Sequence, residues 1–131
     1  MIMTPKKTIQ NAVSSLQNTY PRAHYQGFLL ENNHELLSQC LDKEGFSLEV
    51  ERAISWFENN PRMKVLSRKN DDADLGSLKH SVERWVNNID HRGYISRGAV
   101  LVAAECLGIP HSRDKLHISM AAVEWPRFKK Q

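Results

Sequence analysis

The sequence predicts a mainly α-helical, compact single domain over residues 1–131, with five or six helices and at most a small β element. Apolar residues recur at spacings of three and four along most of the chain, which is the periodicity of helices that bury one face. Capping residues, glycines and prolines stand at the ends of these segments. A chain of 131 residues with 40% hydrophobic and 25% charged side chains can bury a core of its own. A polar loop, 69–76, leaves a second arrangement open, in which it joins subdomains 1–60 and 77–131.

The first helix is expected near the amino end. Thr4 is placed as its N-cap and Pro5 in its first turn, where the missing proline N–H costs nothing. Pro21 ends the pattern, because proline cannot continue a helix. The apolar residues of this segment share one helical face: Ile9, Ala12, Val13, Leu16 and Tyr20.

Two more helices are expected before residue 61. Asn33 is predicted to cap a short helix that ends at Gly45 and carries apolar residues at Leu36, Leu37, Cys40 and Leu41. Ser47 is predicted to cap a longer helix, which stops at Pro61. Its apolar stripe follows the spacing i, i+3, i+4, i+7: Val50, Ala53, Ile54 and Phe57.

The strongest helical signals lie in the carboxyl-terminal half. One helix is expected to begin at Ser77 and run to residue 89, and a second is expected from Arg97 to Leu107. Ser96 is the predicted N-cap of the second helix, and Gly108 is the predicted left-handed residue after its last turn. The second helix is apolar on every face, so it should lie at the centre of the core. The predicted core includes Trp85, Val86, Ile95, Val100, Leu101 and Ala104.

Three segments stay open between strand and other structures. Residues 22–32 read either as a short strand or as a loop that packs its aromatic side chains. Residues 62–68 alternate loosely, but a single strand without a partner is unstable. Residues 115–120 alternate apolar and polar positions, whereas the residues that follow favour a helix.

No membrane segment is expected. The longest strongly apolar run, 99–104, is about a third of the roughly 20 residues that a membrane helix needs. The amino end has lysines but no apolar signal-peptide core, so the protein is expected in the cytoplasm. Cys40 and Cys106 each lie in a helical apolar pattern, and both are expected to be reduced and buried.

Charge is distributed unevenly between the two halves. Residues 1–60 hold 5 Lys and Arg against 7 Asp and Glu, net −2, while residues 61–131 hold 13 against 8, net +5. A basic half permits binding to nucleic acid, although a solvated basic surface has the same composition. The candidate phosphate-binding residues are Arg62, Lys64, Arg68, Lys69, Arg92 and Arg97.

No catalytic or metal-binding constellation is apparent, so the sequence predicts neither an enzyme nor a cofactor. Ser77 and His80 do not form a convincing nucleophile and base, because a cap serine uses its hydroxyl on the backbone. Cys106, His111 and His117 lack the paired spacing of zinc motifs. His80 is instead expected to hydrogen-bond the turn after the helix, with the other turn residues Gly93, Tyr94 and Ser96.

Part of the carboxyl-terminal half resembles a group of small uncharacterised proteins of phages, plasmids and integrated elements. The shared pattern is Leu78-Lys79-His80, Glu83, Gly93-Tyr94-Ile95-Ser96, Gly98, Ala103-Ala104 and Gly108, and it covers about a quarter of the chain. Arg97 departs from the pattern, which has asparagine there. The resemblance implies a mobile-element setting and no particular activity.

Two functions follow as hypotheses. The first is a non-enzymatic accessory protein of a phage or mobile element that binds nucleic acid through its basic half. The alternative is a protein–protein inhibitor or adaptor, such as a counter-defence (anti-CRISPR-like) protein, that occupies the surface of a host or defence protein. A homodimer is open under either hypothesis.

Overall fold

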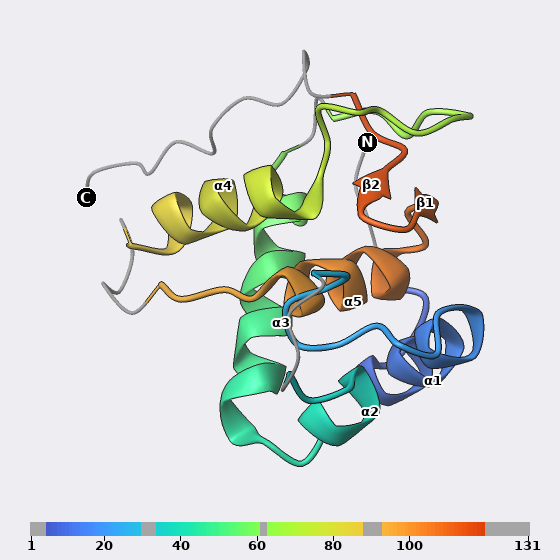
Figure 1. Cartoon of the computed structure of the whole chain (residues 1–131). Helices are drawn as coiled ribbons and strands as arrows, with labels where there is room; N and C mark the ends of the chain where they lie inside the picture. The colour runs from blue at the N-terminus through green and yellow to red at the C-terminus, as the bar shows by residue number, and fades with distance from the viewer. Residues whose placement is uncertain (1–4, 30–33, 61–62, 88–92, 120–131) are drawn as a thin grey trace.

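The computed structural model describes residues 5–29, 34–60, 63–87 and 93–119. Within these ranges the chain forms five helices and one two-stranded sheet (Figure 1). In chain order they are α1 (Ile9–Thr19), α2 (Leu37–Cys40), α3 (Glu44–Glu58), α4 (Leu75–Asn87), α5 (Arg97–Leu107), β1 (His111–Ser112) and β2 (Lys115–Leu116). The predicted fold class, mainly helical with a small β element, is confirmed. None of the helices in these ranges is long and apolar enough to cross a membrane.

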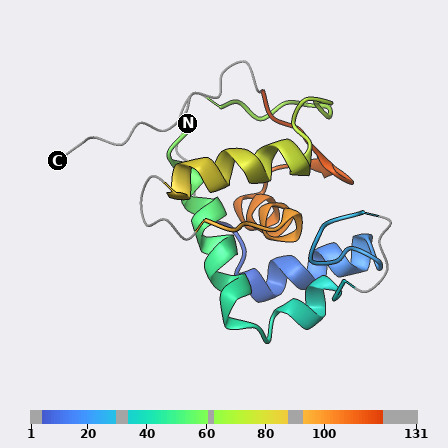
Figure 2. The same ribbon diagram turned by 60° about the vertical axis from the view of Figure 1, so that its left-hand side comes forward.

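Helix α5 lies at the centre of the structure, as its all-round apolar sequence predicts. It packs against α1, α3 and α4, and Figure 2 shows it surrounded by the blue, green and yellow helices. All but two of its side chains are buried. The six predicted core residues from Trp85 to Ala104 are buried as well. Buried residues of α1, α3, α4 and α5 belong to one hydrophobic cluster.

Both ends of α5 have the predicted caps. The Oγ of Ser96 accepts a hydrogen bond from the backbone N–H of Ala99 at 3.1 Å. Gly108 ends the helix with a φ of 74°, which glycine adopts without the steric cost of a Cβ atom.

Helix α1 begins later than predicted. Thr8, rather than Thr4, is the N-cap, since its Oγ1 accepts from the backbone N–H of Asn11 at 3.1 Å. The residues before it are held in another way: the backbone N–H groups of Lys6 and Lys7 donate to the carbonyl of Cys106 at 2.6 and 3.2 Å. These are the N–H groups that the side chain of a Thr4 cap would accept from, and the carbonyl at the end of α5 binds them instead. Thr4 lies outside the described residues.

The predicted starts of α3 and α4 are also wrong. Gly45 does not end α2 but lies in the first turn of α3, which begins at Glu44 rather than after Ser47. Its φ is not left-handed, so it does not act as a C-terminal cap. Helix α4 begins at Leu75, before the predicted Ser77. Asp74 caps it, because its carboxylate accepts from the backbone N–H of Ser77 at 3.0 Å and from the Ser77 hydroxyl at 2.8 Å.

The structure shows which of the three undecided segments, 22–32, 62–68 and 115–120, pair as strands. Strands β1 and β2 form an antiparallel hairpin in which His111 faces Leu116. Residues 63–66 then lie alongside 117–119, where Val65 and Ile118 form a bridge and the N–H of Leu66 donates to the carbonyl of His117 at 2.7 Å. The two segments that lacked strand partners in the sequence are therefore partners of each other. Residues 22–29 form a loop with isolated bridges.

Candidate nucleic-acid interface

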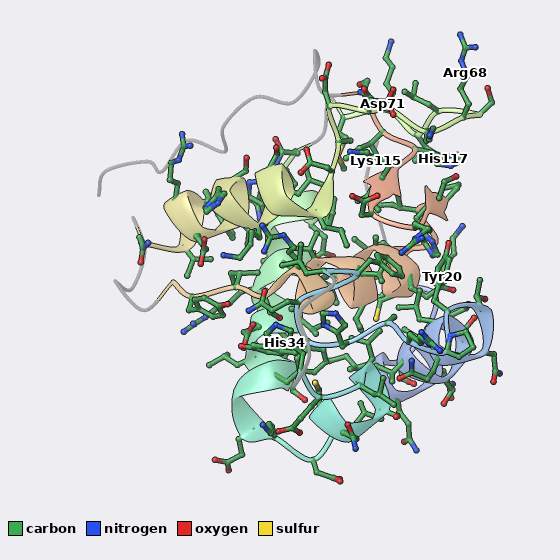
Figure 3. All side chains as sticks on the ribbon, viewed as in Figure 1. Tyr20, His34, Arg68, Asp71, Lys115 and His117 are labelled. Carbon is green, nitrogen blue, oxygen red and sulfur yellow. The ribbon has the colours of Figure 1, made fainter. Side chains whose placement is uncertain are left out.

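The structure separates the predicted basic residues into two places. Lys64, Arg68 and Lys69 are exposed on the loop of residues 63–73, and Figure 3 shows Arg68 near its tip with its side chain directed away from the helices. Arg97 lies elsewhere, at the first position of α5. Arg62 and Arg92 lie outside the described residues. The predicted set is thus not one continuous patch in the described part of the chain.

The loop that carries Lys64, Arg68 and Lys69 is fastened to the β-hairpin. The N–H of Asn70 donates to the carbonyl of Leu116 at 3.1 Å, and its side-chain amide donates to the carbonyl of Ile118 at 3.0 Å. Lys69 has Asp71 at 3.8 Å, an exposed pair of little energetic weight. Hydrogen bonds thus hold the backbone of this loop against the hairpin, while its cationic side chains are exposed to solvent.

Arg97 lines a hollow that also contains an arginine absent from the predicted set. The hollow has a volume of about 380 Å³ and lies beside Phe28, Asp74, Gly76 and Arg113. A second hollow of about 380 Å³ adjoins it, because Phe28 and Arg113 line both, and it adds Tyr20 and Arg22. We call the two hollows together the arginine groove, whose cationic and aromatic side chains are Tyr20, Arg22, Phe28, Arg97 and Arg113.

Arg113 is placed in the groove by its backbone. It lies in the turn between β1 and β2 with a φ of 56°, an uncommon value for a residue with a Cβ atom. Its backbone N–H donates to the hydroxyl of Tyr20 at 3.1 Å, and its guanidinium lies 5.1 Å from the ring centroid of Phe28. The ring of Tyr20 meets Phe28 edge-on, with centroids 5.0 Å apart. The aromatic floor and the cation above it are thus held by mutual contacts.

Arg97 reaches the groove through space left by a glycine. A Cβ atom built on Gly76 would lie 3.1 Å from Nη2 and 3.2 Å from Nε of Arg97. The absence of a side chain at Gly76 therefore lets the guanidinium lie against the start of α4.

The acidic residues of the groove already have partners. Asp74 accepts the two hydrogen bonds from Ser77. Burial raises the pKa of the Asp74 carboxyl, but these hydrogen bonds and the nearby charge of Lys115 have the larger effect, so its pKa lies below the ordinary value. Asp114 lies 3.9 Å from the Nζ of Lys115. Among the described residues, Arg22, Arg97 and Arg113 form no ion pair with a carboxylate. Their charges are available to an anionic ligand.

A chain of hydrogen bonds supports the groove from behind. The Tyr20 hydroxyl lies 3.1 Å from Nδ1 of His111, and Nε2 of His111 lies 2.7 Å from Oε1 of Glu105. Because the Glu105 carboxylate can only accept, Nε2 carries the proton of that hydrogen bond, and in the neutral imidazole Nδ1 then accepts from the Tyr20 hydroxyl. Lys7 forms an ion pair with the same carboxylate. These hydrogen bonds were not predictable from the sequence, because Tyr20 and His111 are 91 positions apart and carry no shared motif.

The predicted turn residues have different environments from one another. The side chain of His80 is 62% exposed and lies 3.4 Å from Glu83, and within the described ranges it makes no hydrogen bond with residues 93–96. The described contact between α4 and this segment comes from Glu83, whose carboxylate accepts the backbone N–H of Ile95 at 3.0 Å. Gly93 is buried, and a Cβ atom there would lie 2.4 Å from Oδ1 of Asn87. Residues 88–92, which include the start of the turn predicted at 90–94, lie outside the described residues.

Tyr94 and Ser96 complete this segment. Tyr94 is 51% exposed, yet its ring stacks on Tyr25 with centroids 6.3 Å apart and has the Nζ of Lys79 at 4.8 Å. Ser96 is fully buried, and its backbone N–H donates to Oε1 of Glu49 at 2.7 Å.

Cysteine and histidine side chains form no metal site in the described part of the chain, where no three His, Cys, Asp or Glu side chains come close enough to hold an ion. Cys40 and Cys106 are free and buried, as predicted. His111 is already committed to Tyr20 and Glu105, and His117 contacts the Ser112 hydroxyl at 2.9 Å.

The arginine groove is therefore the best-defined cationic site of the described chain, with three arginines, an aromatic floor and a hydrogen-bonded support. The resemblance to mobile-element proteins over residues 77–109 stays a prediction. A comparison with protein-family models, with curated proteins and with solved structures found no match to this chain.

Proposed function

We propose that this protein is an accessory protein of a phage or mobile element that binds single-stranded nucleic acid in the arginine groove. The observation that supports the proposal is the guanidinium of Arg113 over the ring of Phe28, with Arg22 and Arg97 lining the adjoining hollows. None of these three arginines is neutralised by a carboxylate of the described chain.

The chemistry of the groove suits a single strand better than a duplex. Proteins that bind single strands combine cationic grooves, which follow the phosphates, with aromatic side chains on which bases stack. Arginine presents a planar fork of N–H donors that matches phosphate oxygens. Phe28 offers a ring on which an unpaired base can stack, whereas the bases of a duplex are already stacked on each other.

The loop of Lys64, Arg68 and Lys69 adds a second electrostatic contribution to the proposal. Its cations have the exposure expected of groups that contact phosphates without reading bases. They should raise affinity for any nucleic acid and make it sensitive to salt.

The experiment is fluorescence anisotropy with labelled single-stranded and duplex oligonucleotides at several salt concentrations. Arg97→Gln and Arg113→Gln should each weaken single-strand binding about tenfold, the loss expected for one charge-assisted hydrogen bond of about 1.5 kcal/mol. Arg84→Gln, an exposed arginine on α4, removes the same charge outside the groove and should change binding less than about twofold. Phe28→Leu should weaken single-strand binding more than duplex binding.

Two results would contradict the proposal. One is the absence of binding even at low salt. The other is equal affinity of the groove variants and the Arg84→Gln control. If only a Lys64, Arg68 and Lys69 triple glutamine variant loses affinity, the nucleic-acid contact belongs to the loop.

The exposed ring of Tyr94 favours a second candidate, an inhibitor or adaptor that binds a host or defence protein. Tyrosine is enriched at interface hot spots, and the contacts with Tyr25 and Lys79 hold this ring in place before any partner arrives. Capture of a defined protein that survives nuclease treatment and is lost with Tyr94→Ala would support it. Retention of that protein by the Tyr94→Ala variant would count against it.

A further inference from the structure

A separate cavity of about 410 Å³ lies beside α3. Its lining includes Tyr25, His34, Glu35, Lys43, Phe46 and Glu49, none of which lines the arginine groove. Figure 3 shows His34 beside α3, towards the end of the molecule that carries α2. Neither the basic loop nor the groove accounts for this cavity.

The cavity contains a buried carboxylate that has no cationic partner among the described residues. Glu49 is only 9% exposed, and its oxygens accept from the Tyr25 hydroxyl and the Ser96 backbone N–H, each at 2.7 Å. Both donors are neutral, and burial together with the bond to Glu49 raises the pKa of Tyr25 above its ordinary value. Among the described residues, no Lys, Arg or His forms an ion pair with Glu49.

The remaining charges of the lining cancel. Glu35 and Lys43 form an ion pair at the solvent side. Of the Asp, Glu, Lys and Arg side chains in the described lining, Glu49 is therefore the one without an opposite charge beside it. A buried anion is stabilised by a cation, because its hydration has been lost and its neutral donors compensate only part of that loss. The Glu49 carboxylate would repel an anionic ligand, and an uncharged ligand would not neutralise the charge of that carboxylate.

Aromatic rings also line the cavity. The rings of Tyr25 and Phe46 adjoin with centroids 6.1 Å apart and an interplanar angle of 53°. The ring of His34 stacks on His24 at 4.9 Å, and His24 is itself held by the carbonyl of Leu29 and the N–H of Gln26. Aromatic faces combined with a carboxylate are the surroundings that organic ammonium groups prefer in proteins.

We propose that this cavity binds an organic ammonium group, with Glu49 as its counter-ion and the rings of Tyr25 and Phe46 against its alkyl substituents. The inference is independent of the nucleic-acid proposal, since the two sites share no lining residue.

Two cations with matched neutral analogues test this inference. Backbone amide NMR spectra of the full chain are recorded during titration with choline and, separately, with n-butylammonium. The controls are 3,3-dimethylbutan-1-ol and butan-1-ol, which have similar shapes and no charge. We expect saturable shifts at Phe46 and its neighbours with at least one cation, and binding of its neutral analogue weaker by about tenfold or more.

Glu49→Gln tests the counter-ion without removing the hydrogen bonds. The glutamine oxygen can still accept from Ser96, and its amide can donate to the Tyr25 oxygen. Cation affinity should fall about tenfold, while Glu51→Gln, on an exposed position of the same helix, should leave it unchanged. If Glu49→Gln fails to fold, Phe46→Leu takes its place and should weaken cation binding about threefold, because the ring is lost and the apolar volume is kept.

The inference is overturned if neither cation gives saturable shifts, if the neutral analogues bind as tightly, or if a folded Glu49→Gln variant keeps full affinity. A failure of the oligonucleotide experiment would not affect it, and a failure here would leave the arginine groove in place.

Discussion

The Nε2 of His111 donates a hydrogen bond to Oε1 of Glu105 at 2.7 Å. This contact joins β1 to α5, and the continuation from His111 to the Tyr20 hydroxyl joins both to the end of α1. Three elements that meet behind the arginine groove thus share one polar chain. Its side chains are part-buried, so breaking one link leaves another group without a partner.

Glu105 should make folding stability depend on acid pH. Burial raises the pKa of its carboxyl, but the hydrogen bonds from Lys7 and His111 outweigh this and keep the pKa below the ordinary 4.5. As pH falls, the carboxyl of Glu105 is therefore protonated in the unfolded chain before it is protonated in the folded protein. Its contribution to the free energy of unfolding is complete above pH 4.5 and is lost as pH falls through the folded-state pKa. Glu105→Gln should lower the free energy of unfolding by about 1–3 kcal/mol at pH 7 and by less at low pH.

Urea denaturation at a series of pH values measures this difference. Glu51→Gln, at an exposed position of α3, is the control and should follow the unsubstituted protein at every pH. A gap between Glu105→Gln and the unsubstituted protein that stays constant with pH would contradict the prediction.

Glu83 and His80 should differ sharply in their effect on stability. Glu83→Ala leaves the backbone N–H of buried Ile95 without its acceptor and should cost about 1–3 kcal/mol. His80→Ala removes a mainly exposed side chain and should change stability by less than about 0.5 kcal/mol. Thermal and urea unfolding of the two variants decide the matter. A large loss for His80→Ala would restore the role that the sequence suggested.

Gly98 and Gly45 should respond in opposite directions to alanine. A Cβ atom on Gly98 would lie 2.6 Å from the carbonyl oxygen of Tyr25 and 2.8 Å from that of His24. Backbone atoms cannot move aside cheaply, so Gly98→Ala should destabilise the protein by about 2 kcal/mol or more. Gly45 has no atom within 4 Å of such a Cβ and lies in α3, so Gly45→Ala should stabilise by about 0.5 kcal/mol. Equal changes in the unfolding midpoint would refute this packing.

The two cysteines should be unreactive in the folded protein. Burial is the main cause that raises the pKa of both Cys40 and Cys106 to about 11. Since the thiolate is the reactive form, a pKa of about 11 rather than 9.0 lowers the thiolate fraction at pH 8 about a hundredfold. A thiol-specific chromogenic reagent should therefore label neither cysteine until denaturant is added, and then both. Fast labelling of either one without denaturant would show that its surroundings are more open.

The parts of the fold that depend on neighbouring residues were predictable from the sequence. Helix α5 is the clearest example, because Ser96, Gly108 and the apolar run between them act within a few positions of one another. Helix starts were less predictable where a distant contact competed with a local signal. The carbonyl of Cys106 binds the chain before α1, and that contact left Thr8 rather than Thr4 as the cap.

The candidate sites, in contrast, depend on contacts between residues that are far apart in the sequence. The sequence identified Arg97 as a candidate cation. Its position beside Phe28 and Arg113 depends on a loop, a helix end and a hairpin turn that meet in space. Glu49 carries no local signal of burial, because its hydrogen-bond partners Tyr25 and Ser96 are 24 and 47 positions away. The physical reason is that periodicity reports which face of a segment is buried, whereas the partner it is buried against is chosen by the packing of the whole chain.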